Sequence, residues 1–156
     1  GTDEMSGSPD FHIDRQGAWR YRGSVIEREA MVRLFAGMLQ RRGEQYVLQT
    51  PEQVLRVRVD DAPFVITDME CSAQDGVPRI WMITNLGERF LLGSEHPLFL
   101  REDPARGEVR AYQRVRDGMP ALVHRNVFYR MAGMAGIDEE SGKAGVRSDG
   151  IFFALE

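Results

Sequence analysis

The stretch Val59–Phe64 has the sequence Val-Asp-Asp-Ala-Pro-Phe, and it interrupts a run of strand patterns. Pro63 has no backbone N–H to donate to a strand ladder, and its ring disfavours helical geometry at Ala62. The two acids before it, Asp60 and Asp61, are typical of loops rather than strands. Strand and helix patterns are complete on both sides of this stretch, so we interpret it as the joint between two halves.

The joint predicts an N-terminal subdomain at residues 11–62 and a C-terminal subdomain at residues 63–156. Residues 1–10 are polar and begin with a glycine typical of tag cleavage, so we expect a disordered leader or tag remnant there. A chain of 156 residues buries about 70% of its unfolded surface. It therefore needs no disulfide or metal ion to hold a core.

Composition excludes several classes of protein. The net charge of −4 is spread evenly over both halves, which argues against binding a nucleic-acid polymer, because such binding needs clustered positive charge. Cys71 is the single cysteine, so an internal disulfide is excluded and a reducing cytoplasm is the expected location. No apolar run approaches the ~18 residues of a membrane-spanning helix. Of the 20 basic residues only Lys143 is lysine; a GC-rich genome explains this most simply, and selection for forked guanidinium contacts is the alternative.

The N-terminal half predicts four strands and one helix. A hairpin turns at Gly17, and a Ser-x-x-Glu capping box at Ser24 precedes a helix that Gly43 ends. The predicted segments are strands 11–14 and 18–21, a helix at 27–42, and strands 46–49 and 54–59. The apolar face of the helix comprises Met31, Val32, Leu34, Phe35, Met38 and Leu39.

The C-terminal half predicts a longer series of strands that again ends in a helix. Asp75-Gly76 is a hairpin signal, and Ile80–Ile83 is apolar on both strand faces, which indicates a central strand. The predicted strands are 64–70, 79–85, 89–92, 98–100, 110–116, 120–123 and 151–155. The helix starts at Arg125, residues 101–107 form an exposed loop, and residues 138–150 form a flexible or hairpin connection. The fold class is α+β, with two subdomains of similar architecture, each a mostly antiparallel sheet packed with one helix.

No catalytic or metal-binding motif is present. The three histidines and Cys71 lack zinc-ligand spacing, and Gly93-Ser94-Glu95-His96 does not match a nucleophile elbow. Gly142–Gly145 lacks the spacing of a phosphate-binding loop. We therefore expect no cofactor, no metal and no catalytic residue.

One predicted strand carries a pattern of arginines that is typical of anion binding. Arg110, Tyr112, Arg114 and Arg116 share a face at a period of two, which suits bidentate phosphate binding with base stacking. A solvated face whose arginines pair with acids is the simpler interpretation. Arg125 begins a helix, where the helix dipole disfavours a cation unless an anion is close.

Short strings spread along the chain also resemble a known family. Those strings are Arg28-x-x-Met31-Val32-x-Leu34-Phe35, Tyr46-x-Leu48-x-Thr50-Pro51, Asp61-Ala62-Pro63-Phe64, Thr84-Asn85-x-Gly87, His96-Pro97-Leu98 and Arg125-x-Val127-Phe128-Tyr129. Together they resemble the bacterial domain-of-unknown-function family 1285, from about Phe11 to Ala132. Glu52-Gln53 departs from the Val-Glu that the family more often has there.

The resemblance implies two subdomains with a repeated motif, the C-terminal one a partly open barrel like a pleckstrin-homology domain. It implies no established activity. A site between the subdomains for a nucleotide-like molecule, and a role in bacterial signal transduction, are what the resemblance suggests.

We therefore hypothesise a cytoplasmic binding protein, more readily a non-enzyme, for a small anionic or nucleotide-like ligand in a groove between the subdomains. The candidate ligand-binding residues are Thr50, Asp60, Asp61, Phe64, Thr84, Asn85, His96, Arg114, Arg116, Arg125 and Tyr129. Two alternatives remain open. One is a protein or peptide interaction module that uses a sheet edge, and the other is a hydrolase or transferase built on His96.

Overall fold

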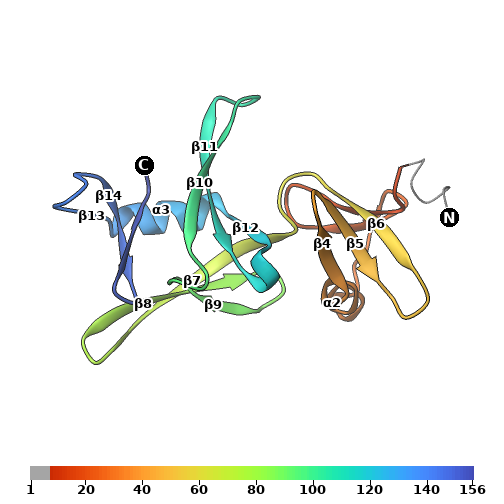
Figure 1. Cartoon of the computed structure of the whole chain (residues 1–156), viewed down its shortest axis with the longest axis horizontal. Coiled ribbons are helices and arrows are strands. Elements are labelled where there is room, and N and C mark those ends of the chain that lie inside the picture. The colour runs from red at the N-terminus through yellow and green to blue at the C-terminus, as the bar shows by residue number, and fades with distance from the viewer. Residues whose placement is uncertain (1–7) are drawn as a thin grey trace. The chain divides into compact units, whose positions relative to one another are not determined.

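The computed structural model describes residues 8–156, so most of the predicted leader lies outside the described residues (Figure 1). The chain divides between Pro63 and Phe64 into two compact units. Each unit contains one six-stranded sheet, and the C-terminal unit adds a small third sheet. The α+β class with two similar subdomains is confirmed, and no closed barrel is present in the part of the chain that the structure describes.

The sheet of the N-terminal unit has the strand order β3-β2-β1-β6-β5-β4. Its elements are β1 (Phe11–Ile13), β2 (Trp19–Tyr21), β3 (Ser24–Val25), helix α2 (Glu29–Gly37), β4 (Leu39–Arg42), β5 (Gln45–Gln49) and β6 (Val54–Val59). Helix α2 packs on one face, where the Phe35 ring lies 5.0 Å from the Phe11 ring and 6.2 Å from the Trp19 ring. Ile13 and Trp19 are almost fully buried there.

The helix is shorter than the sequence predicts, and its last predicted turn is a strand. Leu39–Arg42 pairs with β5 as β4, because Gly43, with a φ of 66°, makes the hairpin turn instead of ending a helix. The predicted capping box is also wrong: Ser24 lies in β3, and Arg28 is the N-cap without a side-chain cap. Leu34, predicted to face the core, is 57% exposed.

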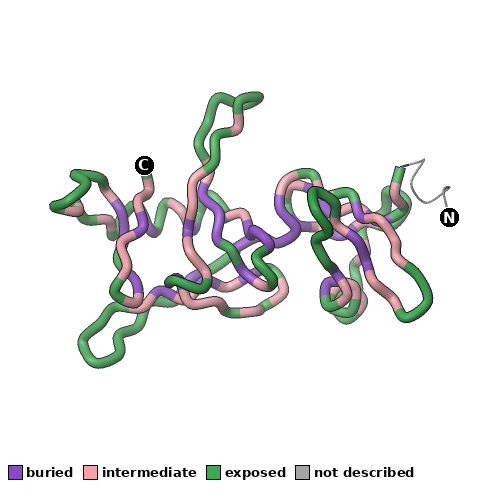
Figure 2. Tube along the Cα trace, in the orientation of Figure 1, coloured by how far each residue is buried: buried purple, intermediate pink, exposed green. Residues whose placement is uncertain are grey.

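The main sheet of the C-terminal unit has the order β10-β11-β12-β7-β8-β9. Its strands are β7 (Phe64–Gln74), β8 (Val77–Thr84), β9 (Arg89–Leu91), β10 (Leu98–Asp103), β11 (Glu108–Arg114) and β12 (Pro120–Val123). Figure 2 shows that the tips of the β7–β8 and β10–β11 hairpins are exposed. Two predictions are wrong here: residues 101–103 continue β10, and Arg116 lies in a 3-10 turn (Arg116–Gly118) rather than on β11.

Both six-stranded sheets are joined in the middle by the same arrangement. In each sheet the strand that comes first in the chain runs parallel to the strand that comes last, β1 beside β6 and β7 beside β12, while every other neighbouring pair is antiparallel. A Phe-x-Ile sequence forms the first strand or its start: Ile13 lies opposite Val59, and Ile66 lies opposite Val123. The carbonyls of both isoleucines accept a hydrogen bond at 3.0 Å, from the N–H of Asp60 and of His124 respectively. The repeat is therefore one of strand topology, built around a buried isoleucine.

The helices occupy different places in the two repeats. Helix α2 lies between the two three-stranded meanders of its sheet, whereas α3 (Arg125–Gly133) follows the last strand. Val127 and Met131 are buried on α3, which packs against β7 and β14. The third sheet contains β13 (Gly136–Ile137), β14 (Ala144–Ser148) and β15 (Ile151–Ala154). A side chain at Gly145 would lie 2.2 Å from the Phe153 carbonyl oxygen, so this position requires glycine.

No helix within residues 8–156 has the length and apolar character needed to cross a membrane.

We expect the parallel junction to dominate the stability of each sheet. Ile13→Ala removes a side chain with no exposed surface, so it should lower the free energy of unfolding by about 2–5 kcal/mol. Leu34→Ala, at a 57% exposed position in the same unit, should change it by about 0.5 kcal/mol or less. Urea unfolding followed by circular dichroism measures both. Equal effects of the two substitutions would contradict this assignment of the core.

A second prediction concerns Asp14, whose carboxylate closes the β1–β2 turn. Burial alone would raise its pKa, but hydrogen bonds from Arg20 and from the N–H groups of Ala18 and Gln16 outweigh burial and lower the pKa below its ordinary 3.8. Because the pKa is lower in the folded state, ionised Asp14 stabilises the protein above about pH 4, and this contribution is lost as the pH falls further. The stability advantage of the wild type over Asp14→Asn should be constant near neutral pH and shrink in acid. An advantage that grows below pH 4 would contradict the assignment.

Candidate functional site

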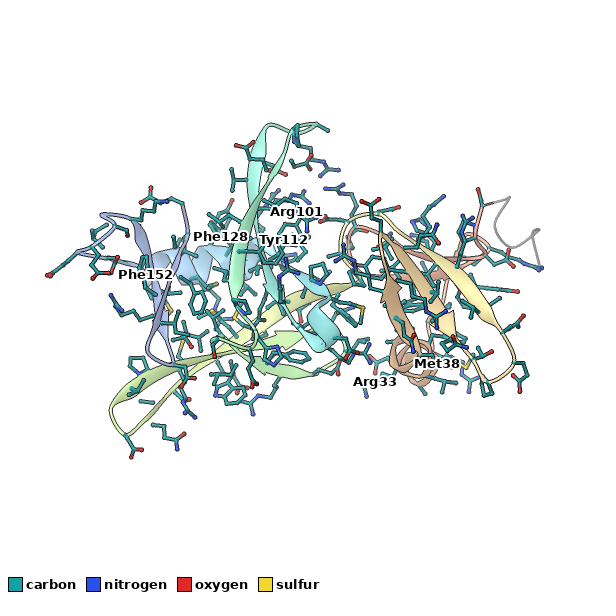
Figure 3. The ribbon with its side chains drawn as sticks, viewed as in Figure 1. Arg33, Met38, Arg101, Tyr112, Phe128 and Phe152 are labelled. Carbon is teal, nitrogen blue, oxygen red and sulfur yellow. The ribbon has the colours of Figure 1, made fainter. Side chains whose placement is uncertain are left out.

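The β10–β11 hairpin presents two arginines that lie on aromatic rings. Phe99 and Tyr112 are opposite each other on the paired strands, and their rings stack with centroids 5.5 Å apart. The Arg101 guanidinium lies 4.5 Å from the Tyr112 ring centroid, and the Arg114 guanidinium lies 4.7 Å from the Phe99 ring centroid. We call these four residues the arginine–aromatic face. Figure 3 shows Arg101 and Tyr112 close together on this hairpin.

The register of the hairpin explains why these side chains meet. Directly opposite residues of antiparallel strands project from the same face, and Phe99–Tyr112 and Arg101–Arg110 are such pairs. Period-two alternation then adds Arg114 to the same face of β11. The arginine–aromatic face is therefore fixed by one strand pairing and does not depend on a loop.

The two guanidiniums of this face have no carboxylate partner within residues 8–156. None of the ion pairs within residues 8–156 involves Arg101 or Arg114, and both side chains are exposed. Arg114 donates one hydrogen bond, from Nη1 to the Gly118 carbonyl at 3.2 Å. Arg110, on the same face, is paired with Glu108 at 3.0 Å. Ring contacts thus hold two cations in place while most of their N–H donors stay available to an anion.

A short network at the start of β10 holds the backbone of Arg114. His96 Nδ1 lies 3.1 Å from the Arg114 carbonyl oxygen, and the imidazole packs edge-on against Phe90 at 4.9 Å. The fully buried Gln113 donates from Nε2 to the His96 carbonyl at 3.1 Å. Arg114 N–H donates to the Pro97 carbonyl at 3.0 Å. His96 therefore positions the end of β11, and a backbone carbonyl, rather than a carboxylate, orients its ring.

The surroundings of His96 differ from those of a histidine in an Asp–His pair. A general base of the Asp–His kind needs a carboxylate that orients the imidazole. None of the ion pairs found among residues 8–156 includes His96. No group of three or more metal-ligating side chains occurs in the described part of the chain either.

The other predicted site residues of the C-terminal unit have mainly structural surroundings. Thr84 is 2% exposed, and its Oγ1 accepts hydrogen bonds from the N–H groups of Leu86 and Glu88, which closes the β8–β9 turn. Asn85 Oδ1 accepts from the Val65 N–H at 3.2 Å, next to the parallel junction. These two residues fix the end of β8.

Phe64 and Arg116 are brought together, and two helix residues point outward. Phe64 is 1% exposed, and the Arg116 guanidinium lies 5.2 Å from its ring centroid. Arg125 is exposed at the first position of α3, whose first turn contains no acid. Tyr129 is 62% exposed on the same helix.

Thr50, Asp60 and Asp61 belong to the N-terminal unit, and the groove between the subdomains stays a prediction. Thr50 Oγ1 exchanges hydrogen bonds with the Gln53 backbone and so forms a local turn. Asp60 Oδ2 lies 2.8 Å from His12 Nε2, and Arg58 Nη2 lies 3.0 Å from His12 Nδ1. The Asp60–His12–Arg58 cluster is thus internally neutralised, unlike the arginine–aromatic face.

Sequence reasoning found Arg114 and missed Arg101 and Phe99. Both missed residues follow the His96-Pro97 dipeptide, and the polar stretch 101–107 favours a loop. Extending the period of two from Phe99 to Arg101, and pairing it with Arg110 and Tyr112 across a hairpin, would have revealed the face.

The hydrogen bonds of the histidines predict which ring nitrogen carries the proton in each neutral imidazole. A backbone carbonyl only accepts, so His96 must be protonated on Nδ1. His124 Nδ1 accepts from the Asn126 N–H at 3.1 Å, so its proton must be on Nε2. Long-range proton–nitrogen NMR spectra above the histidine titration range should show these two opposite tautomers. A His96 ring protonated on Nε2 would contradict the network that holds Arg114, and His124 serves as the internal reference.

Two family models match the chain in order from residue 2 to residue 155. Residues 2–62 match the model of the N-terminal domain of the domain of unknown function DUF1285, and residues 63–155 match the model of its C-terminal domain. A comparison with curated proteins gives no match. The crystal structure of a DUF1285 family protein from Silicibacter pomeroyi DSS-3 superposes with a TM-score of 0.86 at 39% identity, over 96% of this chain and 81% of that one. One from Shewanella baltica OS155 gives 0.62 at 26% identity, over 80% and 91%. With both family models matched in order along its length, the chain belongs to the DUF1285 family.

Proposed function

We propose that this protein is a cytoplasmic, non-enzymatic binding protein for a small anionic, nucleotide-like ligand, and that the arginine–aromatic face holds the anionic group. The observation that carries the proposal is the pair of guanidiniums seated on stacked rings without a carboxylate partner within residues 8–156. An arginine fork binds phosphate oxygens bidentately, and a guanidinium already held in place loses less side-chain entropy on binding.

Comparison with two other arginine–aromatic pairs of the same unit, those of Arg89 and Arg147, supports this assignment. Arg89 lies 5.1 Å from the Trp81 ring and pairs with Glu70 at 2.7 Å; Arg147 lies 5.5 Å from the Phe152 ring and pairs with Asp138 at 2.7 Å. Those cations are already neutralised, so an incoming anion would have to displace a carboxylate. Arg101 presents no such competitor.

The shape of the face favours an anion that meets both guanidiniums. Both lie within 6 Å of the Phe99 ring centroid, Arg101 at 5.8 Å and Arg114 at 4.7 Å. A phosphate ester or a diphosphate presents several oxygens over a comparable distance. A nucleoside on such a group would find aromatic and guanidinium surfaces beside it for stacking.

A thermal-shift screen tests the proposal, with inorganic phosphate, pyrophosphate, mono- and dinucleotides and cyclic dinucleotides as probes. A ligand at a hundredfold excess over its Kd stabilises the folded protein by about 2.7 kcal/mol, which raises Tm measurably. Arg101→Ala and Arg114→Ala should each weaken binding of the best probe by about ten- to a hundredfold, because each removes charge-assisted hydrogen bonds of roughly 1.5–3 kcal/mol.

Arg147→Ala is the matched control, since it removes an exposed arginine that also lies on a ring but already has a carboxylate partner. It should leave the affinity for the probe unchanged. Isothermal titration calorimetry gives the Kd of each variant. The proposal fails if no probe raises Tm, or if all three variants bind alike.

A further inference from the structure

The outer strand β10 leaves one edge of the main C-terminal sheet open. β10 pairs only with β11, and it is the last strand of the sheet order within the described residues. With six residues it is the longest of the outer strands; the others, β3, β4, β9, β13 and β15, have between two and four. In Figure 1 the β10–β11 hairpin projects from the rest of its unit.

The alternation of hydrogen bonds between β10 and β11 shows which backbone groups of β10 face this open edge. Arg114 N–H donates to the Pro97 carbonyl, so Pro97 and Arg114 form a hydrogen-bonded pair. Such pairs alternate along an antiparallel ladder, so Phe99, Arg101 and Asp103 also bond to β11. The N–H and C=O groups of Leu98, Leu100 and Glu102 therefore point to the open side.

This edge has little of the protection that outer strands usually carry. Proline, a bulge or a covering strand commonly blocks pairing with another chain. β10 contains no proline, its register with β11 is regular, and β15, which contacts it, belongs to another sheet. Of these protective features β10 has only the charged side chains of residues 101–103, which disfavour pairing with another chain.

The side chains of β10 define what a neighbouring strand would carry. On one face lie Phe99 and Arg101 of the arginine–aromatic face; on the other lie Leu98, which is buried, and Leu100, which is half-buried. Successive residues of a strand beside β10 would lie alternately next to Arg101 and next to Leu100. Acidic side chains would complement Arg101, and apolar side chains would complement Leu100.

We propose that β10 accepts an extended segment of a partner protein as an added strand, and that this segment alternates acidic with apolar residues. The added strand would satisfy the outward amides, and its acids would pair with Arg101. This inference goes beyond the proposed small-ligand function; the two share Arg101 but differ in the backbone groups they use.

The experiment titrates the full chain into a labelled eight-residue peptide of alternating valine and glutamate. A peptide of the same composition with its residues in two blocks, and an alternating peptide with every second amide N-methylated, are the controls. Because strand addition needs both the pattern and the backbone N–H groups, each control should bind at least about tenfold more weakly. Arg101→Glu should reduce binding of the acidic peptide and favour a peptide with lysine in place of glutamate.

Amide hydrogen exchange supplies the readout that separates this proposal from anion binding. The peptide should protect the amides of Leu98, Leu100 and Glu102, and should leave those of Phe99 and Arg101 unchanged because β11 already holds them. Inorganic pyrophosphate should protect none of these amides, so the peptide result stands or fails independently of the phosphate screen.

Three outcomes would overturn the proposal: equal affinity for the alternating and block peptides, binding without protection of the three outward amides, or the same protection appearing with protein concentration in the absence of peptide. The last would identify a second copy of the chain as the occupant of the edge. Leu100→Pro removes one outward N–H and should abolish peptide binding. Arg101→Glu provides an independent test if the proline variant fails to fold.

Discussion

Each main sheet depends on the parallel pairing between the strand that comes first in the chain and the strand that comes last, β1 with β6 and β7 with β12. Ile13 beside Val59 and Ile66 beside Val123 bring together segments that are more than forty residues apart in the chain. Without that pairing each main sheet would consist of two separate three-stranded meanders. Closing so long a loop costs entropy before any contact forms, so the isoleucine at each junction must be deeply buried to offset it. Both isoleucines have no exposed surface.

Much of this fold could be predicted because its signals are local. The turns at Gly17, Asp75-Gly76 and Asp117-Gly118 all have positive φ values, as their sequences indicate. The parallel junctions have no local signal, since a Phe-x-Ile strand does not show which strand lies beside it. The predicted end of α2 is wrong for a related reason. Leu39 continues the helical spacing of apolar residues, but the pairing of Leu39–Arg42 with β5 overrides that preference.

The candidate site shows the same division between local and distant information. Arg114 could be found from the alternation along its own strand, whereas Arg101 belongs to a charged segment that resembles a loop until β11 is placed beside it. Thr84 and Asn85 were correctly expected at a strand end, yet their hydrogen bonds close a turn and tie β8 to β7. Polar residues at strand ends serve turns as readily as ligands, and only their partners distinguish the two uses.

An arginine on an aromatic ring is common in this chain, and its consequence depends on the next neighbour. Arg22 on Tyr21, Arg89 on Trp81 and Arg147 on Phe152 each pair with an acid, so the ring contact adds packing to an ion pair. Where the acid is missing, the same contact has a different effect. The ring attracts the cation without neutralising it, and it restricts a side chain that would otherwise lose much entropy on binding. Arg101 and Arg114 have ring contacts but no carboxylate partner within residues 8–156, and the outer edge of their hairpin is also unpaired. The cationic face and the open backbone therefore meet on one strand, β10.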